Sequence, residues 1–200
     1  GVDLKFPHHE NEIAQSECAH GKPMARYWVH NEFLNMGSEK MSKSIGNVKL
    51  IRDLLKDWDG EVIRLALLKA HYRSELVWTE ELLKESKAQL DGWYETKNLV
   101  IQNSVLKGSH STPKHHMIDS LKMETDRCLF NDLSLPALMR YFSEIEKRLS
   151  VYTRGADSML AVDETGVPFL VKDQRIWLAK DFFETANLLG LLQKDPEDWF

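Results

Sequence analysis

Two lysines three positions apart, Lys40 and Lys43, lie among small hydroxyl residues in a run with glycines on both sides. From residue 38 to 44 the only apolar side chain is Met41, so this run cannot build a core. Two ammonium groups, neighbouring serine hydroxyls and a flexible backbone are suited to holding a polyphosphate, because lysine is a point charge that follows phosphate oxygens. The alternative for such a run is a solvated surface loop.

A second set of residues that could do chemistry lies near the start of the chain. His8 and Glu12 are four positions apart, and His9 and Glu12 are three apart. On a helix, either spacing brings the two side chains to one face. Histidine and carboxylate side chains both bind zinc in proteins, so this face could form part of a metal site. On residue type alone, an exposed His–Glu pair is the favoured alternative.

Both stretches match motifs of a known enzyme family. The run Lys40-Met41-Ser42-Lys43-Ser44 matches in full the KMSKS signature of the class I aminoacyl-tRNA synthetases. Residues 3–16 read DLKFPHHENEIAQS, which resembles the zinc-site helix of the cysteinyl-tRNA synthetases, D-L-x-F-P-H-H-E-N-E-I-A-Q-S. The spacing between the two motifs also fits that family. The detailed resemblance reaches as far as Ser74, and beyond it only the helical pattern is similar.

The resemblance implies an enzyme, a cysteine--tRNA ligase that activates cysteine with ATP and transfers it to its tRNA. The positions that match His8 and Glu12 would bind one Zn²⁺, together with two cysteines from earlier in the family's chain. Lys43 in first place, and Lys40 in second, would stabilise the charge that grows on the phosphate oxygens as pyrophosphate leaves. The residues expected to bind ATP are Lys40, Met41, Ser42, Lys43 and Ser44.

Part of the family's active site does not occur in this sequence. Class I synthetases also carry an H-I-G-H-like histidine motif, which is absent from these 200 residues. The two cysteines present, Cys18 and Cys128, are not at ligand positions of the family pattern. Gly1 already lies inside a family motif, so we expect a fragment without the N-terminal catalytic half and the C-terminal tail, inactive on its own.

Three other functions remain open. Cysteine ligases that act on a small amino sugar are similar in both motifs, although the helical segment after Ser74 favours the tRNA enzyme. A class I synthetase of the methionyl type is a second alternative, and the run of residues 8–12, HHENE, argues against it. The third is a non-catalytic helical interaction module in which the lysine run is incidental.

The elements that must position these residues begin with short strands. We expect a strand or the exit of a strand over residues 2–6, a helix from His8 to about His20 ended by Gly21, and a strand over 27–30. Residues 32–36 would continue that strand or form the return strand of a hairpin with it, and Gly37 would supply the turn before the lysine run. Two helices follow, over residues 51–58 and 62–74. Residues 1–74 would then be the C-terminal part of a Rossmann-like class I catalytic domain. Within it, Arg64, His71 and Arg73 are interpreted as helix-packing and capping residues.

Residues 75–200 are predicted to form an antiparallel helical bundle that binds tRNA, so the fold is expected to be mainly α. The helices would begin near Thr79, Lys114, Ser134 and Lys172, and Pro196 would end the ordered chain. Residues 131–136 partly match a turn of the family. Three apolar stripes at helical spacing are expected to be buried: Leu83, Leu90, Trp93, Tyr94, Val100 and Ile101; Leu138, Phe142, Ile145, Leu149 and Tyr152; and Leu178, Phe182, Thr185, Leu189 and Leu192.

Composition limits the partners and the compartment. The net charge is -5, and residues 74–200 carry 21 Asp+Glu against 15 Lys+Arg, so any tRNA contact there must be local rather than a broad basic surface. No apolar run approaches a membrane span, and no signal peptide opens the chain. Two cysteines far apart in sequence suit a reducing compartment. We therefore expect a cytoplasmic protein without membrane contact, and favour a monomer.

Overall fold

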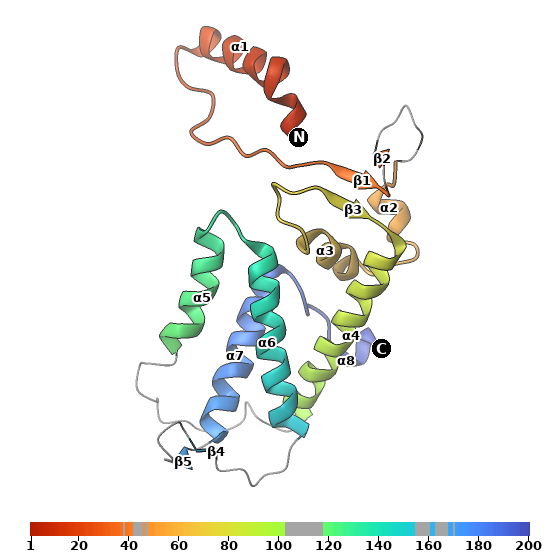
Figure 1. Cartoon of the computed structure of the whole chain (residues 1–200), viewed down its shortest axis with the longest axis vertical. Coiled ribbons are helices and arrows are strands. Elements are labelled where there is room, and N and C mark those ends of the chain that lie inside the picture. Colours follow the sequence, from red (N-terminus) through yellow and green to blue (C-terminus); the bar gives the residue numbers. More distant parts are fainter. Residues whose placement is uncertain are drawn as a thin grey trace.

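The computed structural model describes residues 1–37, 39–41, 46, 48–102, 118–154, 161–162, 168–169 and 171–200. Most of the described chain is helical, with a few short strands, as Figure 1 shows. The expectation of a mainly helical chain is therefore confirmed. Within the described residues, no helix is long and apolar enough to cross a membrane.

The chain opens with three consecutive helical segments, and the prediction of a strand over residues 2–6 is wrong. A 3-10 turn η1 (Val2–Leu4) leads into a π-helical turn η2 (Lys5–His9) and then into helix α1 (Glu10–His20). The Leu4 amide donates to the Gly1 carbonyl at 3.1 Å, as in a helical turn, and the Val2 amide makes one bond to the Asn31 carbonyl at 2.9 Å, so this segment turns on itself and does not pair as a strand. Helix α1 ends as predicted at Gly21, which is left-handed with φ +65°.

A three-stranded sheet follows, in the order β2-β1-β3. Strand β1 (Leu34–Met36) pairs antiparallel with β2 (Glu39–Lys40) and parallel with β3 (Leu76–Trp78). The turn between β1 and β2 contains Gly37 with φ +63°, so the predicted turn at Gly37 is confirmed, but it joins β1 to β2 and residues 32–36 are not the return strand of a hairpin with 27–30. The strand predicted over residues 27–30 is wrong, because the backbone of this segment joins no ladder. Its Trp28 and His30 rings stack on each other instead.

Two helices connect this sheet to the longer ones. Helix α2 (Ile51–Leu54) is short, and α3 (Gly60–Leu68) packs on α4 (Glu80–Gln102). Asp59 caps α3 by accepting a hydrogen bond from the Glu61 amide at 3.0 Å. Thr79 caps α4 as predicted, with its Oγ1 accepting from the Leu82 amide at 3.1 Å.

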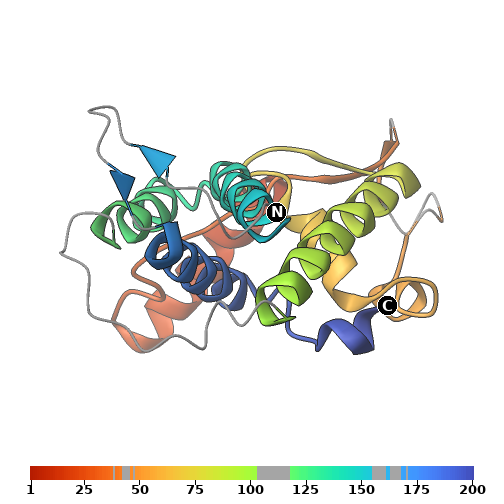
Figure 2. The same ribbon diagram turned by 90° about the horizontal axis from the view of Figure 1, so that it is seen from below.

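The remaining helices are α5 (Ile118–Phe130), α6 (Leu135–Arg154), α7 (Val171–Leu189) and α8 (Pro196–Trp199). Helix α6 packs against α4, α5 and α7, and Figure 2 shows these helices from below, with α4 running obliquely across the view. Strands β4 (Ala161–Val162) and β5 (Pro168–Phe169) form a small antiparallel pair before α7.

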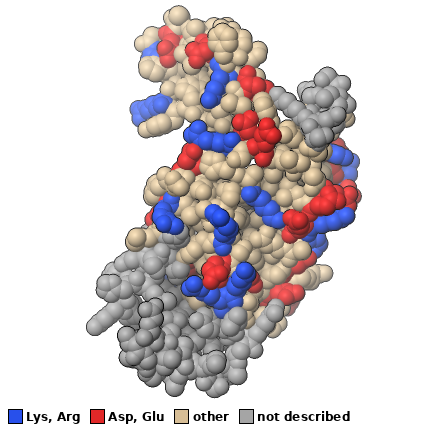
Figure 3. Space-filling view, in the orientation of Figure 1, with Lys and Arg blue, Asp and Glu red and all other residues tan. Residues whose placement is uncertain are grey.

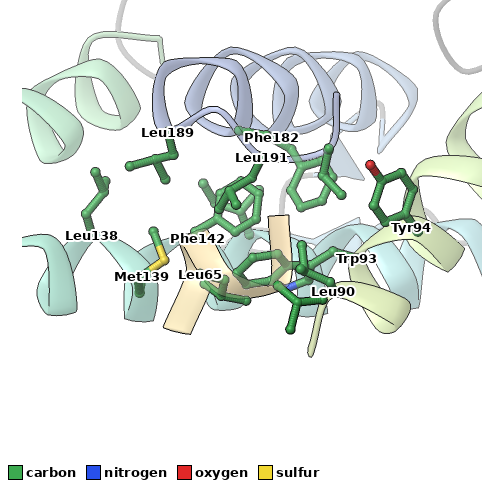
Figure 4. Close-up of a cluster of buried hydrophobic side chains, with 14 of the residues drawn as sticks. Leu65, Leu90, Trp93, Tyr94, Leu138, Met139, Phe142, Phe182, Leu189 and Leu191 are labelled. Carbon is green, nitrogen blue, oxygen red and sulfur yellow. The ribbon is translucent and has the colours of Figure 1, made fainter. Parts of the chain in front are cut away.

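One apolar core joins α3, α4, α6 and α7 (Figure 4). Its centre is aromatic: Trp93 and Phe142 meet edge-to-face with centroids 4.5 Å apart, and Phe142 stacks on Phe182 at 4.6 Å. Apart from Tyr152, whose side chain lies outside the described part, the predicted stripes are buried with one exception, Ile101, which is 47 % exposed. Helical spacing therefore identified the buried faces of α4, α6 and α7, whereas other core residues, such as Trp78, Cys128 and Leu191, lie outside the predicted stripes.

The end of the chain is part of the fold, so the prediction that Pro196 ends the ordered structure is wrong. Helix α8 contacts α4, where the Trp199 ring stacks on Tyr94 with centroids 4.3 Å apart. The Trp199 indole N–H donates to the Asp91 carboxylate at 2.7 Å. We call residues 190–200 the C-terminal strap, because they run from α7 back across α3 and α4.

A buried carboxylate holds this strap. Glu61 on α3 is 8 % exposed and accepts hydrogen bonds from the amides of Leu192 (2.7 Å) and Gln193 (3.0 Å). The Tyr94 hydroxyl donates to the same carboxylate at 3.0 Å. Burial raises the pKa of Tyr94, so this hydroxyl stays protonated and remains a donor. The Arg64 side chain caps α7 by donating to the Leu189 carbonyl at 2.6 Å, which confirms the capping role expected for Arg64.

Asp181 on α7 gives this fold a pH dependence. Burial, with the nearby charge of Glu184 adding to it, raises the pKa of Asp181 to about 6. A carboxyl whose pKa is higher in the folded state contributes stability at low pH, and that stability is lost as the pH rises through about 6.

We therefore expect Asp181→Asn, which is neutral at every pH, to stabilise the chain by about 1 kcal/mol at pH 8 and to change nothing at pH 4. Urea unfolding at the two pH values measures this. Glu17→Gln, an exposed change on α1, is the control. An equal gain at both pH values would show that the charge of Asp181 is not responsible.

Candidate active site

The lysine run begins on the edge strand of the sheet. Asn35 pairs with Lys40 in the β1–β2 ladder, and the Met41 amide donates to the Leu34 carbonyl at 3.2 Å. The run therefore leaves the sheet at Met41. Ser42, Lys43 and Ser44 lie outside the described residues. The assignment of Lys40–Ser44 to ATP binding accordingly stays a prediction.

The predicted zinc ligands lie at the start of α1. His8 is in the π-helical turn η2 and Glu12 is in the first turn of α1, and both side chains are exposed. In the described part of the chain, no three His, Cys, Asp or Glu side chains come together in a way that could hold a metal ion. His8 and Glu12 supply two ligands at most, whereas zinc takes four, so the described residues do not complete a zinc site on their own.

A cluster of rings connects η2 to the segment before β1. His9 Nδ1 and His30 Nε2 are 2.9 Å apart, so one ring donates to the other. Trp28 stacks on His30 with centroids 6.3 Å apart and lies 5.7 Å from the His9 ring. Partial burial lowers the pKa of His30, and the charge of Lys5 lowers it further. The cluster therefore favours a neutral His30, whose ring donates one hydrogen bond and accepts another.

A polar cavity of about 180 Å³ lies beside these rings. The cavity brings together cationic, anionic and aromatic side chains from three separate segments of the chain. A backbone hydrogen bond links two of these segments, because the Glu32 amide donates to the Tyr72 carbonyl at 2.7 Å. The residues that line it are Val2, Lys5, Trp28, His30, Glu32 and Arg73. Sequence spacing could not place Arg73 here, because it is far along the chain from the others.

Arg73 also contacts the turn between α5 and α6. Its Nε lies 2.6 Å from Asp132 Oδ2, and the Tyr72 hydroxyl donates to Asp132 Oδ1 at 2.5 Å. These contacts go beyond the packing role that the sequence suggested for Arg73. One feature of the sequence pointed toward these contacts: residues 71–74 and residues 131–136 both resemble segments of the same family. The resemblance did not show that the two segments touch.

Comparison with known proteins relates the sequence of this chain to a family of ligases. Residues 1–88 match the family "tRNA synthetases class I (C) catalytic domain". A cysteine--tRNA ligase of Hyphomonas neptunium is 45% identical over 199 residues, which cover 100% of this chain and 38% of that protein. The chain is homologous to cysteine--tRNA ligases along its whole length. Cysteine--tRNA ligases of Parvibaculum lavamentivorans and Maricaulis maris are 41% and 38% identical, again over 100% of this chain.

The match to cysteine--tRNA ligases confirms the resemblance seen in the first 74 residues and extends it through the helices. The chain spans well under half of the relatives it matches, 37% to 38% of their length. The rest of such a ligase lies outside the stretch that aligns with this chain.

Proposed function

We propose that this chain is part of a cysteine--tRNA ligase, which forms cysteinyl-AMP from cysteine and ATP and passes the cysteine to the terminal ribose of its tRNA. One observation carries the proposal: the whole chain aligns with proteins named cysteine--tRNA ligase at 38–45% identity. The position of the lysine run, next to the β1–β2 hairpin, supports it.

In the proposed reaction, the lysine run acts on ATP. The carboxylate of cysteine attacks the α-phosphorus, and the bond to pyrophosphate breaks. Negative charge grows on the phosphate oxygens, so cations placed there stabilise the transition state more than the ground state. Lys43 is the first candidate for this role and Lys40 the second, while Ser42 and Ser44 can donate hydrogen bonds. Glycines beside the run, such as Gly46 with φ +73°, allow it to close over the nucleotide.

The proposed metal is one Zn²⁺ held by His8 and Glu12 together with two ligands from outside this chain. When bound, such an ion would take the deprotonated thiol of cysteine as a ligand, which serine and alanine cannot supply equally well. Within this chain, the contribution of His8 and Glu12 is to present two ligands on one helix face. His9, in the same segment, contacts Trp28 and His30.

We also propose the domain division at residues 74 and 75, with the C-terminal part of the catalytic domain before it and an antiparallel helical bundle for tRNA after it. Lys and Arg side chains are interspersed with Asp and Glu over the described part of the face in Figure 3. Contact with tRNA is therefore expected at a few positions and not over a basic surface. The ligase is expected to act in the cytoplasm as a monomer.

The test uses the whole polypeptide that the gene encodes and measures ATP–pyrophosphate exchange with cysteine and with serine. We expect exchange with cysteine only. His8→Ala should weaken zinc binding at least tenfold, because it removes a metal ligand. It should also lower the ratio of the exchange rate with cysteine to the exchange rate with serine. His20→Ala, an exposed change at the other end of α1, is the matched control. Exchange that does not depend on cysteine would overturn the proposed function.

A further inference from the structure

The turn between α5 and α6 contacts, through Asp132, a residue that lines the cavity beside His30, Arg73. Asp132 and Leu133 both have φ +53°, a conformation that turns the chain sharply after Phe130. In this conformation Asp132 contacts three consecutive residues, His71, Tyr72 and Arg73, which are about 60 positions earlier in the chain.

Both oxygens of the Asp132 carboxylate have partners. Arg73 Nη2 donates to Oδ1 at 3.2 Å, and Arg73 Nε, which donates its hydrogen to the Tyr72 hydroxyl at 2.8 Å, lies 2.6 Å from Oδ2, so the guanidinium contacts both carboxylate oxygens. The Tyr72 hydroxyl also donates to Oδ1. The hydrogen bonds from Arg73 hold the pKa of Asp132 below its usual value. The Asp132 backbone carbonyl adds a contact of 2.8 Å to His71 Nε2.

Residues 71–73 lie at the end of the proposed catalytic part, and the backbone here is bonded to the segment that enters β1. The Tyr72 carbonyl accepts from the Glu32 amide, and the Leu76 amide donates to the Phe33 carbonyl at 3.1 Å. These bonds fix the segment that enters β1, which in turn leads into the lysine run. The Arg73 side chain forms part of the wall of the cavity beside His30. Asp132 thus connects the α5–α6 turn with both β1 and the cavity.

We propose that Asp132 is a positioning residue for the transfer of cysteine to tRNA. By binding Tyr72 and Arg73, it fixes the position of helices α5 and α6 relative to the cavity beside His30. This inference rests on the proposed function. Asp132 itself has no contact with the reacting atoms in this proposal. The activation of cysteine and its transfer to tRNA are therefore expected to respond differently to a change at Asp132. Activation of cysteine depends on the lysine run, whereas transfer needs a tRNA held by the helices to reach the catalytic part in the correct position.

The experiment compares Asp132→Gly with Leu133→Gly in the whole polypeptide that the gene encodes. Both positions have the same positive φ, and glycine suits it at both, so neither change strains the backbone. Only Asp132→Gly removes the carboxylate. We expect Asp132→Gly to lower kcat for tRNA charging about tenfold, with cysteine-dependent ATP–pyrophosphate exchange and KM for tRNA unchanged within about twofold.

A double-mutant cycle with Arg73→Lys sharpens the test. Lysine keeps the charge but cannot bind in a bidentate manner, so the cycle should show that the two changes are not additive in kcat. Equal kcat values for Asp132→Gly and Leu133→Gly would overturn the positioning role. A parallel fall in exchange and charging would also overturn it, since that indicates a structural role only. The absence of cysteine-dependent exchange in the unaltered polypeptide would instead overturn the ligase assignment, and this inference with it.

Discussion

Lys43→Ala in the whole polypeptide is expected to lower cysteine-dependent ATP–pyrophosphate exchange about a hundredfold, with a smaller effect on KM for ATP. The reason is that the charge on the phosphate oxygens grows during the step, so a lysine placed there contributes more in the transition state than in the bound substrate. The effect should fall on kcat in steady-state exchange assays at saturating ATP and cysteine.

Lys49→Ala is the matched control for this prediction. Lys49 is an exposed lysine six positions further along the chain and outside the signature run. We expect it to change exchange by less than about twofold, since surface charges of this kind contribute little. If Lys43→Ala and Lys49→Ala behave alike, the lysine run is incidental and the reading of the chain as a non-catalytic helical module gains support.

Glu61→Ala should destabilise the chain by about 3 to 5 kcal/mol. The change leaves the amides of Leu192 and Gln193 and the hydroxyl of Tyr94 without their common acceptor in a buried place. Each unsatisfied buried donor costs about 1 to 3 kcal/mol, and alanine also leaves a cavity. Urea unfolding followed by circular dichroism measures the loss.

The control for Glu61→Ala is Glu85→Ala. The Glu85 side chain is 73% exposed and lies 4.0 Å from Lys69, so its removal should cost less than about 1 kcal/mol. A loss within 1 kcal/mol for Glu61→Ala as well would contradict the account of the C-terminal strap as a part of the fold that the buried carboxylate holds. Glu61→Gln should be intermediate, because its amide keeps one oxygen acceptor but replaces the other by a donor.

Local patterns predicted the helices and the core better than the strands and the contacts. The apolar spacing of Leu138, Phe142 and Ile145 identified the buried face of α6, since a 3.6-residue period is a property of the helix itself. Tyr27 and Trp28 suggested a strand by residue type, but strand formation needs a partner edge, which spacing along the chain does not reveal.

Long-range polar contacts were outside the reach of the sequence. The bond from the Leu192 amide to Glu61 spans 131 positions, and nothing in either neighbourhood indicates its partner. A capping role was expected for Arg64, but its acceptor, the Leu189 carbonyl, appears only in the folded chain. For the candidate site, the motifs identified His8, Glu12 and the lysine run, whereas the link from Asp132 to Arg73 required the structure.

The most direct test of the proposed ligase is the transfer step itself, measured as the attachment of radiolabelled cysteine to tRNA by the whole polypeptide with ATP and Zn²⁺ supplied. The account predicts that cysteine tRNA becomes charged, and that a small amino sugar is not joined to cysteine under the same conditions. Activation of cysteine followed by transfer to the amino sugar, with no charging of tRNA, would contradict it.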